Sequence, residues 1–142
     1  MSEDVYLDQI NIVVRDIEKS AAFYARLGLK VGDESPPEWQ PHHREAPTEG
    51  ADLGLDSAAF TAQWNQGWPG GSGLVMSFRV PTRDHVDRLY ADLVADGHVA
   101  QQSPYDAFWG ARFAIIADPD GNAVGLMSPP DPGRQSRPVP PE

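Results

Sequence analysis

The sequence predicts an α+β fold built from two βαβββ repeats. Residues 5–14 and 75–80 alternate between apolar and more polar side chains, and each segment precedes a stretch in which apolar residues have helical spacing. When the sequence is aligned with itself so that Val14 matches Val80, the beginnings of the two repeats superpose. A slightly larger offset, which matches Gly54 with Gly125, superposes their ends. The 142 residues match the usual length of one domain and are enough to bury a core.

The first repeat covers about residues 5–57. Its opening strand leads into a helix expected over residues 17–27, because Asp16 is a good N-cap and Gly28 is a good stop. Four prolines follow, and they obscure the strand boundaries in the rest of this repeat. Only residues 51–57 read clearly as a further strand.

The second repeat covers about residues 74–129. Residues 58–73 are rich in Gly, Gln and Trp, and they predict a crossover linker between the repeats. Thr82 is expected to cap a helix over residues 83–96. Three short strands are expected after it, with a DPDGN turn between the last two: 99–105, 112–117 and 123–128.

Residues 1–129 therefore form the predicted domain, and residues 130–142 are a proline-rich tail. The 14 residues after Ser128 contain six prolines and almost nothing to bury. We expect an extended conformation for this segment. Whether the tail covers a cleft or packs on a neighbouring molecule stays open at this stage.

Composition and charge limit the classes of function. The 11 Lys and Arg against 21 Asp and Glu give a formal net charge of −10, which argues against nucleic acid as a partner because phosphate binding needs a basic face. Without cysteine there are no disulfides, thiolate metal sites or cysteine nucleophiles. No long apolar run and no secretory leader are visible, so we expect no membrane association and a cytoplasmic location.

Two motifs carry a family resemblance. INIVVRDIEKSAAFYARLGL near the start and FWGARFAIIADPDGNAVGLMSP near the end resemble the vicinal oxygen chelate superfamily, which contains glyoxalase I, extradiol dioxygenases and bleomycin-resistance proteins. The resemblance covers roughly residues 5–129, and the second motif is commonest in the resistance-protein-like members. It implies that each half curls its sheet around a cleft, that helices pack on the outer face, and that the protein is a homodimer with its ligand near the junction of paired units.

The period-two rule assigns each strand residue to one of two faces. One set is apolar and is expected to meet the helices: Ile10, Ile12, Val14, Leu53, Leu55, Met76, Phe78, Val80, Val124 and Leu126. The opposite set is mixed in polarity, and the resemblance makes it the lining of the cleft: Gln9, Asn11, Val13, Asp52, Gly54, Asp56, Val75, Ser77, Arg79, Ala123, Gly125 and Met127.

The metal positions of the family are poorly matched. Carried onto this chain by the resemblance, they are Gln9, Gly54, Val75 and Gly125, of which only Gln9 has a side-chain donor. A catalytic divalent ion needs about three protein donors, so the sequence predicts no metal and no other cofactor. The histidines do not change this prediction, because surface or local capping roles are expected for all four: His42, His43, His85 and His98.

Large aromatic side chains outside the periodic core positions are the more informative signal. Such rings in loops around a cleft are suited to stacking on a planar ligand. Some of them alternatively close the ends of the two halves or form a dimer contact. The residues concerned are Trp39, Trp64, Trp68 and Trp109, together with Tyr105 and Phe108.

Two functions remain as alternatives. The preferred one is a metal-independent binding protein, similar to bleomycin-resistance proteins, that sequesters an aromatic antibiotic and has no catalytic residue. Gln9, Asn11, Ser77, Asp52 and Asp56 would then hydrogen-bond the ligand or counter a cation, whereas Arg79 or Arg112 would meet an anion. The other is a glyoxalase-like isomerase, lyase or epimerase in the same cleft, with a carboxylate from Asp52, Asp56 or Glu38. The sequence does not separate a drug from a metabolite as the ligand.

Overall fold

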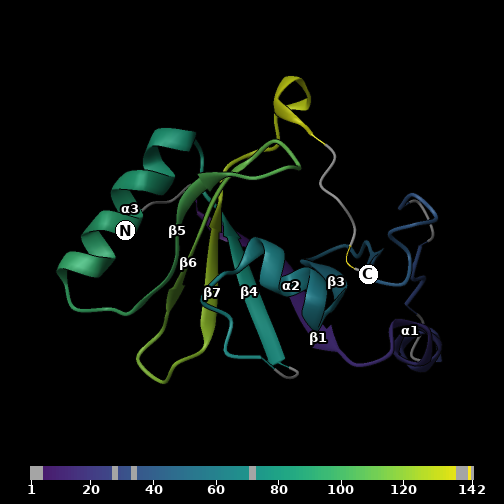
Figure 1. Ribbon diagram of the computed structural model, residues 1–142. Helices are drawn as coiled ribbons and strands as arrows, with labels where there is room; N and C mark the ends of the chain where they lie inside the picture. Colours follow the sequence, from purple (N-terminus) through teal and green to yellow (C-terminus); the bar gives the residue numbers. More distant parts are fainter. Residues whose placement is uncertain (1–4, 27–28, 33–34, 71–72, 137–140, 142) are drawn as a thin grey trace.

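Seven strands form one curled sheet, and three α-helices pack against it (Figure 1). The computed structural model describes residues 5–26, 29–32, 35–70, 73–136 and 141. The elements of these residues are β1 (Tyr6–Val14), α1 (Ile17–Ala25), β2 (His43–Ala46), β3 (Asp52–Ser57), α2 (Ala58–Trp64), β4 (Gly73–Arg79), α3 (Arg83–Ala95), β5 (Ala100–Asp106), β6 (Arg112–Ala117), β7 (Ala123–Met127) and the short 3-10 helix η1 (Pro132–Arg134).

The strand order β2-β3-β1-β4-β7-β6-β5 reveals the internal repeat. In each half the first strand pairs in parallel with the last one, β1 with β3 and β4 with β7. The antiparallel pair β1 and β4 joins the halves at the centre of the sheet. The predicted α+β repeat fold is therefore confirmed, although in the described residues two strands follow the helix of the first repeat and three follow that of the second.

Both predicted helix caps are present. The Asp16 side chain accepts a hydrogen bond from the Lys19 amide at 3.1 Å, and Thr82 Oγ1 accepts one from the His85 amide at 3.1 Å. The first helix ends slightly earlier than predicted, and its expected stop, Gly28, lies outside the described residues.

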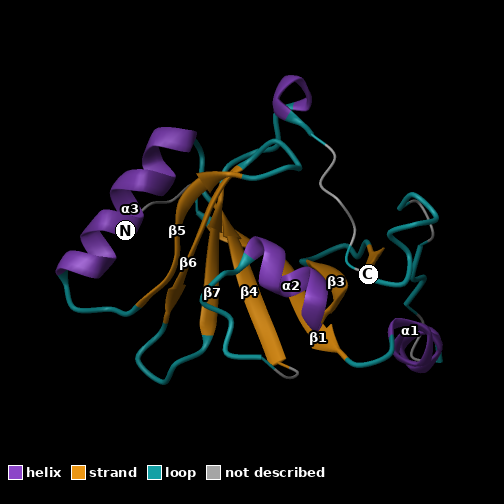
Figure 2. Cartoon of the chain, in the orientation of Figure 1, coloured by secondary structure: helices purple, strands orange, loops and turns teal. Residues whose placement is uncertain are grey.

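The predicted linker contains a helix that the sequence analysis missed. Ser57 Oγ accepts a hydrogen bond from the Phe60 amide at 3.1 Å and so caps α2 at its N-terminus. The helix contacts β3 and β1, and it buries Phe60, Thr61 and Trp64. Figure 2 shows α2 lying against one face of the sheet, near β1 and β3. At seven residues it is too short for a periodic pattern to identify from the sequence.

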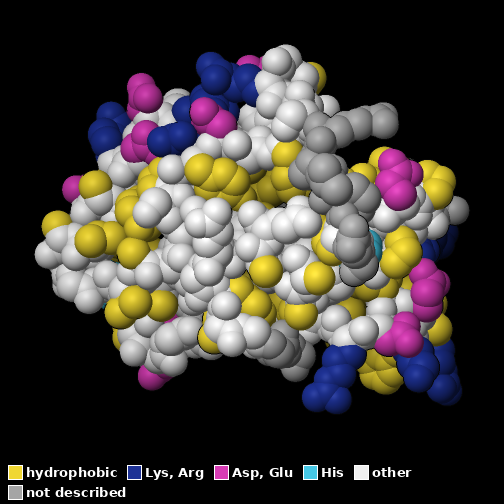
Figure 3. Space-filling model, in the orientation of Figure 1, with side chains coloured by type: hydrophobic (Ala, Val, Ile, Leu, Met, Phe, Trp, Pro, Cys, Tyr) yellow, Lys and Arg dark blue, Asp and Glu magenta, His cyan; other side chains and the backbone are white. Residues whose placement is uncertain are grey.

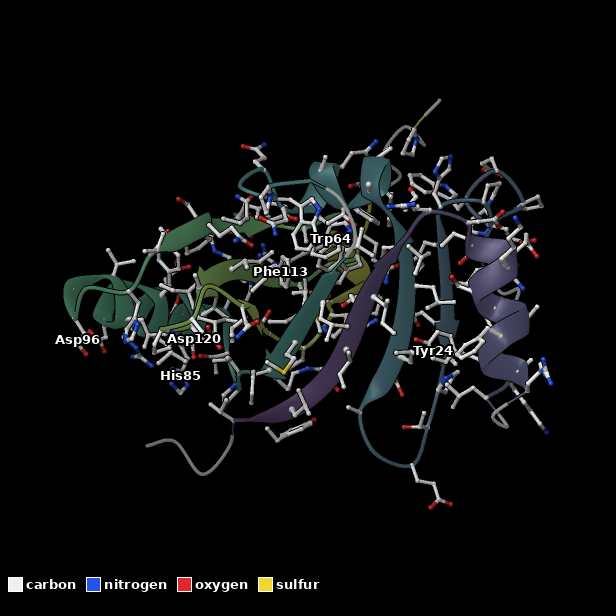
Figure 4. The ribbon with its side chains drawn as sticks, turned by 90° about the horizontal axis from the view of Figure 1, so that it is seen from below. Tyr24, Trp64, His85, Asp96, Phe113 and Asp120 are labelled. Carbon is white, nitrogen blue, oxygen red and sulfur yellow. The ribbon has the colours of Figure 1, made fainter. Side chains whose placement is uncertain are left out.

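The outer face is covered at its two ends rather than at its centre. Helix α1 packs on β3 and β2, whereas α3 packs on β6, β5 and β7, and Figure 4 shows the two helices at opposite ends of the sheet. Leu55 and Leu126 are buried against them, as predicted. On the central strands, Ile10, Met76 and Phe78 are only partly buried, so the prediction that they meet helices is wrong.

Leu74, beside these residues on β4, is 55% exposed. In the part of the chain that the structure describes, α1 and α3 therefore leave an apolar strip on the outer face of β1 and β4, made of Leu7, Ile10, Leu74, Met76 and Phe78. No helix among the described residues is both long enough and apolar enough to cross a bilayer.

Candidate functional site

A cavity of about 340 Å³ opens on the concave side of the sheet. One part of its lining is aromatic or apolar: Phe60, Trp64, Phe108, Trp109, Phe113, Met127 and Pro130. The other part is polar or charged: Asp8, Gln9, Asn11, His43, Glu45, Asp52, Asp56, Ser77, Arg79 and Gln135. On the face drawn in Figure 3, charged side chains gather toward the ends of the molecule, and the middle is mostly uncharged with hydrophobic side chains at its hollows.

The apolar wall is a set of rings packed edge to face. Trp109 lies between Phe108 and Phe113, with ring centroids 5.0 and 5.1 Å apart, and its Nε1 donates to the sulfur of Met127 at 3.2 Å. Figure 4 shows Trp64 of α2 and Phe113 of β6 directed toward each other, with ring centroids 6.0 Å apart. Edge-to-face packing holds the rings in fixed orientations. Trp64 and Phe113 are buried behind the surface, whereas Phe108 and Trp109 are only partly buried and keep ring surface available to a planar ligand.

The polar wall is centred on a buried carboxylate. Asp56 on β3 is 1% exposed, and its two oxygens accept hydrogen bonds from Asn11 Nδ2 at 2.6 Å and from His43 Nδ1 at 2.7 Å. The opposite side of the imidazole faces Glu45, with His43 Nε2 at 3.2 Å from its Oε1. Gln9 Nε2 donates to the same oxygen at 3.2 Å.

These contacts keep His43 protonated at neutral pH. Burial alone would lower the pKa of His43, but the charges and hydrogen bonds of Asp56 and Glu45 outweigh it and raise the pKa from 6.5 to about 10. In return, the hydrogen bond from His43 lowers the pKa of Glu45, against the opposing effect of burial. The imidazolium is therefore held between two carboxylates.

A second ion pair stands at the other side of the polar wall. Arg79 on β4 and Asp8 on β1 approach to 2.7 Å, and Arg79 Nε is buried without a hydrogen-bond partner in the part of the chain that the structure describes. Asp52 completes the wall. Four carboxylates stand against the two cations Arg79 and protonated His43, so the cavity carries an excess of negative charge.

Nine of the predicted ligand-binding residues line this cavity: Gln9, Asn11, Asp52, Asp56, Trp64, Ser77, Arg79, Phe108 and Trp109. Gly54 and Gly125 lie directly below its floor. A Cβ at Gly54 would lie 2.5 Å from Asn11 Nδ2, and one at Gly125 would lie 2.5 Å from Ser77 Oγ. The glycines therefore leave the space that those two polar side chains occupy.

Three predicted residues are not part of the lining. Trp39 is 8% exposed and stacks behind Phe108, with ring centroids 6.1 Å apart. Trp68 packs against the aromatic core cluster without reaching the cavity. Arg112 is directed toward α3, where its Nε donates to Asp87 at 2.9 Å, so its predicted place in the cleft needs correction.

The prediction of a surface or capping role is wrong for His43, which lines the cavity, whereas His42 hydrogen-bonds Ser57, the residue that caps α2. Prolines on both sides concealed the short strand β2, and the alternation of His43 and Glu45 within it was the available signal. Two further lining residues were not predicted: Phe60, which the unexpected helix α2 carries, and Phe113 on β6, which lies opposite Met127.

The residues at the four positions where the family resemblance implies metal ligands do not fit a catalytic metal ion. Two of the four corresponding positions are glycine and one is valine. No group of three or more His, Cys, Asp or Glu side chains in the described residues is arranged to hold a metal ion.

The comparisons with known proteins agree with this fold. The family model described as Glyoxalase/Bleomycin resistance protein/Dioxygenase superfamily matches residues 6–126, and the chain therefore belongs to this superfamily. No curated protein matches it.

Among solved structures, the chain resembles one described as NAD-dependent benzaldehyde dehydrogenase from Legionella pneumophila, with a TM-score of 0.61 and 22% sequence identity. The match covers 84% of this chain and 96% of that one. It also resembles methylmalonyl-CoA epimerase from Mycobacterium tuberculosis, with a TM-score of 0.55, 23% identity and coverage of 89% of each chain. The Mn(II)-bound glyoxalase from Novosphingobium aromaticivorans has a TM-score of 0.60, 19% identity, and coverage of 86% of this chain and 38% of that one. At these identities the likeness concerns the fold alone.

Proposed function

We propose that the protein is a metal-independent binding protein that sequesters a planar, aromatic organic molecule with a cationic or hydrogen-bonding end, such as an aromatic antibiotic. The observation that carries the proposal is the division of one cavity into a wall of aromatic rings and a wall rich in carboxylates. Sequestration needs affinity alone, so no residue has to act on the ligand chemically.

The physical properties of the cavity favour this class of ligand. Its volume of about 340 Å³ lies in the range of small-molecule pockets. The rings of Phe108 and Trp109, which are only partly buried, offer apolar surface to a planar group, and the carboxylates favour a positive charge at the other end. An excess of negative charge also attracts a cation from solution before contact. The same fluorescence assay, applied to a panel of aromatic antibiotics and a panel of aromatic metabolites, would show which of the two classes binds more tightly.

Proflavine, a planar cation, tests the proposal together with acridine, its uncharged counterpart of similar shape. Saturable quenching of tryptophan fluorescence is expected for both, with tighter binding of proflavine. Trp109→Phe should remove a large part of the quenching, whereas Trp68→Phe should leave the dissociation constant unchanged, since Trp68 does not line the cavity. The absence of saturable quenching by either compound would contradict the proposal.

A glyoxalase-like enzyme is the second candidate, and one observation favours it. His43 lines the cavity, with its Nδ1 fixed by the buried Asp56 at 2.7 Å and its Nε2 against Glu45 at 3.2 Å, so a substrate that displaced Glu45 would meet the N–H of an oriented imidazolium. The test is exchange of carbon-bound hydrogen in D₂O, followed by NMR, with 2-oxo acids and acyl thioesters as substrates. Exchange that depends on His43 and is lost in His43→Gln would move the function to this class.

We further propose that two copies of the chain associate through the uncovered strip of β1 and β4. The strip is built from an antiparallel pair in which Ile10 lies opposite Met76 and Leu7 opposite Phe78, so it is nearly symmetric and suits an isologous contact with its own copy. A cytoplasmic homodimer without nucleic acid as a partner is consistent with the absence of cysteine and the net charge of −10.

A further inference from the structure

The chain beyond β7 returns to the rim of the cavity. Ser128 continues the pairing of β7 with β6, because its amide donates to Arg112 O at 3.0 Å and its Oγ accepts from the Arg112 amide at 2.8 Å. Residues 129–136 then run past the turn that connects β5 to β6. Figure 1 shows η1 at this end of the sheet, beside that connection.

Two backbone hydrogen bonds attach this segment to the turn that carries Phe108 and Trp109. The Asp131 amide donates to Gly110 O at 3.0 Å, and the Ser136 amide donates to Phe108 O at 2.8 Å. Between these points Asp131 caps η1 by accepting a hydrogen bond from the Gly133 amide at 2.9 Å. The segment is therefore shaped by its own cap and fixed at both ends.

The same segment contributes directly to the cavity. Pro130 and Gln135 are part of its lining, although both residues are largely exposed to solvent on their other sides. A proline-rich sequence suits this position because its backbone needs few hydrogen bonds and loses little conformational entropy when it is ordered.

We infer that residues 129–136 form a strap that completes the binding site, holds the Phe108–Trp109 wall in place and slows release of a bound ligand. This inference rests on the proposed function of the cavity for its effect on ligand release. The effect on the wall concerns the free protein and does not depend on any ligand. Opening of the strap breaks the two backbone hydrogen bonds to the turn and needs no change in the sheet.

Ser136 offers a matched pair of variants. Ser136→Pro removes the amide that donates to Phe108 O, and Gln135, with φ −74° and ψ 145°, already has a backbone conformation that a following proline accepts. Ser136→Ala keeps the amide and serves as the control. A chain that ends at Ser128 removes the whole strap.

The first measurement is ¹⁹F NMR of the free protein with 5-fluorotryptophan at its four tryptophans, with Trp109→Phe used for assignment. The Trp109 resonance is expected to shift or broaden in Ser136→Pro and in the shortened chain, and to stay in place in Ser136→Ala. The Trp68 resonance should stay in place in every variant and so report that the fold is intact. An unchanged Trp109 resonance in the shortened chain would overturn the inference for the wall.

The second measurement is the dissociation rate of proflavine by stopped-flow fluorescence. Loss of one net hydrogen bond predicts an increase of about two- to tenfold in Ser136→Pro over Ser136→Ala, and a larger increase in the shortened chain. Equal rates in all proteins would overturn the role in ligand release. If the full chain does not bind proflavine, the proposed function fails for this ligand class, and the ¹⁹F measurement still decides whether the strap positions the wall.

Discussion

The clearest consequence of the polar network is a pH-dependent stability carried by His43. Its pKa is raised from 6.5 to about 10 in the folded protein. Between these two values the folded state holds a proton that the unfolded state releases, so rising pH favours unfolding. The contribution of His43 is therefore complete below about pH 6.5 and is lost as the pH passes through about 10.

The size of the effect follows from the same two pKa values. Each pH unit inside the interval lowers the free energy of unfolding by about 1.4 kcal/mol. From about pH 7.5 to about pH 9.5 the loss adds up to about 2 to 3 kcal/mol, because His43 begins to release its proton near the upper limit. The interaction has this strength because His43 is 22% exposed and Asp56 is 1% exposed, so solvent screens the pair weakly.

Urea denaturation at a series of pH values measures the effect. His43→Gln removes the titrating group, and the neighbouring His42→Gln is the matched control, because His42 hydrogen-bonds the hydroxyl of Ser57 instead of a carboxylate. The difference in unfolding free energy between the wild type and His43→Gln should shrink by about 2 to 3 kcal/mol over this pH range, whereas the difference from His42→Gln should stay constant. Parallel curves for wild type and His43→Gln, or an NMR titration of His43 with a midpoint near 6.5, would refute the reasoning.

Three other perturbations test separate parts of the structure. Gly54→Ala places a Cβ 2.5 Å from Asn11 Nδ2 and should lower the free energy of unfolding by about 1 to 3 kcal/mol in urea denaturation, whereas Gly50→Ala, whose nearest contact is 4.0 Å away, should change it by less than about 0.5 kcal/mol. Leu74→Glu should convert the proposed dimer into a monomer in size-exclusion chromatography with light scattering, and a monomeric wild type would contradict the interface. EDTA, or added Mn²⁺ or Zn²⁺, should change the dissociation constant of proflavine by less than about twofold, because no group of three or more His, Cys, Asp or Glu in the described residues is arranged to hold a metal ion. A larger change would contradict metal-independent binding.

The sequence was sufficient for the framework because the relevant signals are local. Alternation over residues 5–14 and 75–80 sets the strand faces, and Asp16 and Thr82 satisfy helix amides within their own turns. The internal repeat then limits how the strands can be ordered. These features place Gln9 and most of the other predicted residues at the cavity without any long-range information.

The remaining part of the site depends on contacts that a periodic pattern does not contain. β2 has four residues between proline-rich stretches, so nothing local indicated that His43 pairs with Asp56 across the strands. Arg112 was predicted to lie in the cleft. It is the first residue of β6, and its guanidinium forms an ion pair with Asp87 of α3 instead. The uncovered outer strip depends on how far apart the two helices pack, which their sequences do not encode locally.

The floor of the cavity repeats in the two halves. Asn11 on β1 is paired with Gly54 on β3, and Ser77 on β4 is paired with Gly125 on β7. The shift that superposes the beginnings of the repeats places Asn11 on Ser77, and the shift that superposes their ends places Gly54 on Gly125. A polar side chain over a glycine is thus a property of the repeat itself.

The two walls differ because the same positions carry different side chains. His43 lies opposite Asp56 in the pairing of β2 with β3, and Phe113 lies opposite Met127 in the equivalent pairing of β6 with β7. The shift that places Gly54 on Gly125 also places Asp56 on Met127, so the ionic pair of the first half corresponds to the apolar pair of the second. Because the halves meet at β1 and β4, β2 and β3 of the first repeat supply carboxylates and His43 to one wall, and β6 and β7 of the second supply apolar side chains to the other, while Ser77 and Arg79 of β4 belong to the polar wall. A ligand that matches the cavity would lie across the junction, with its ring system against the second repeat and its charged end against the first.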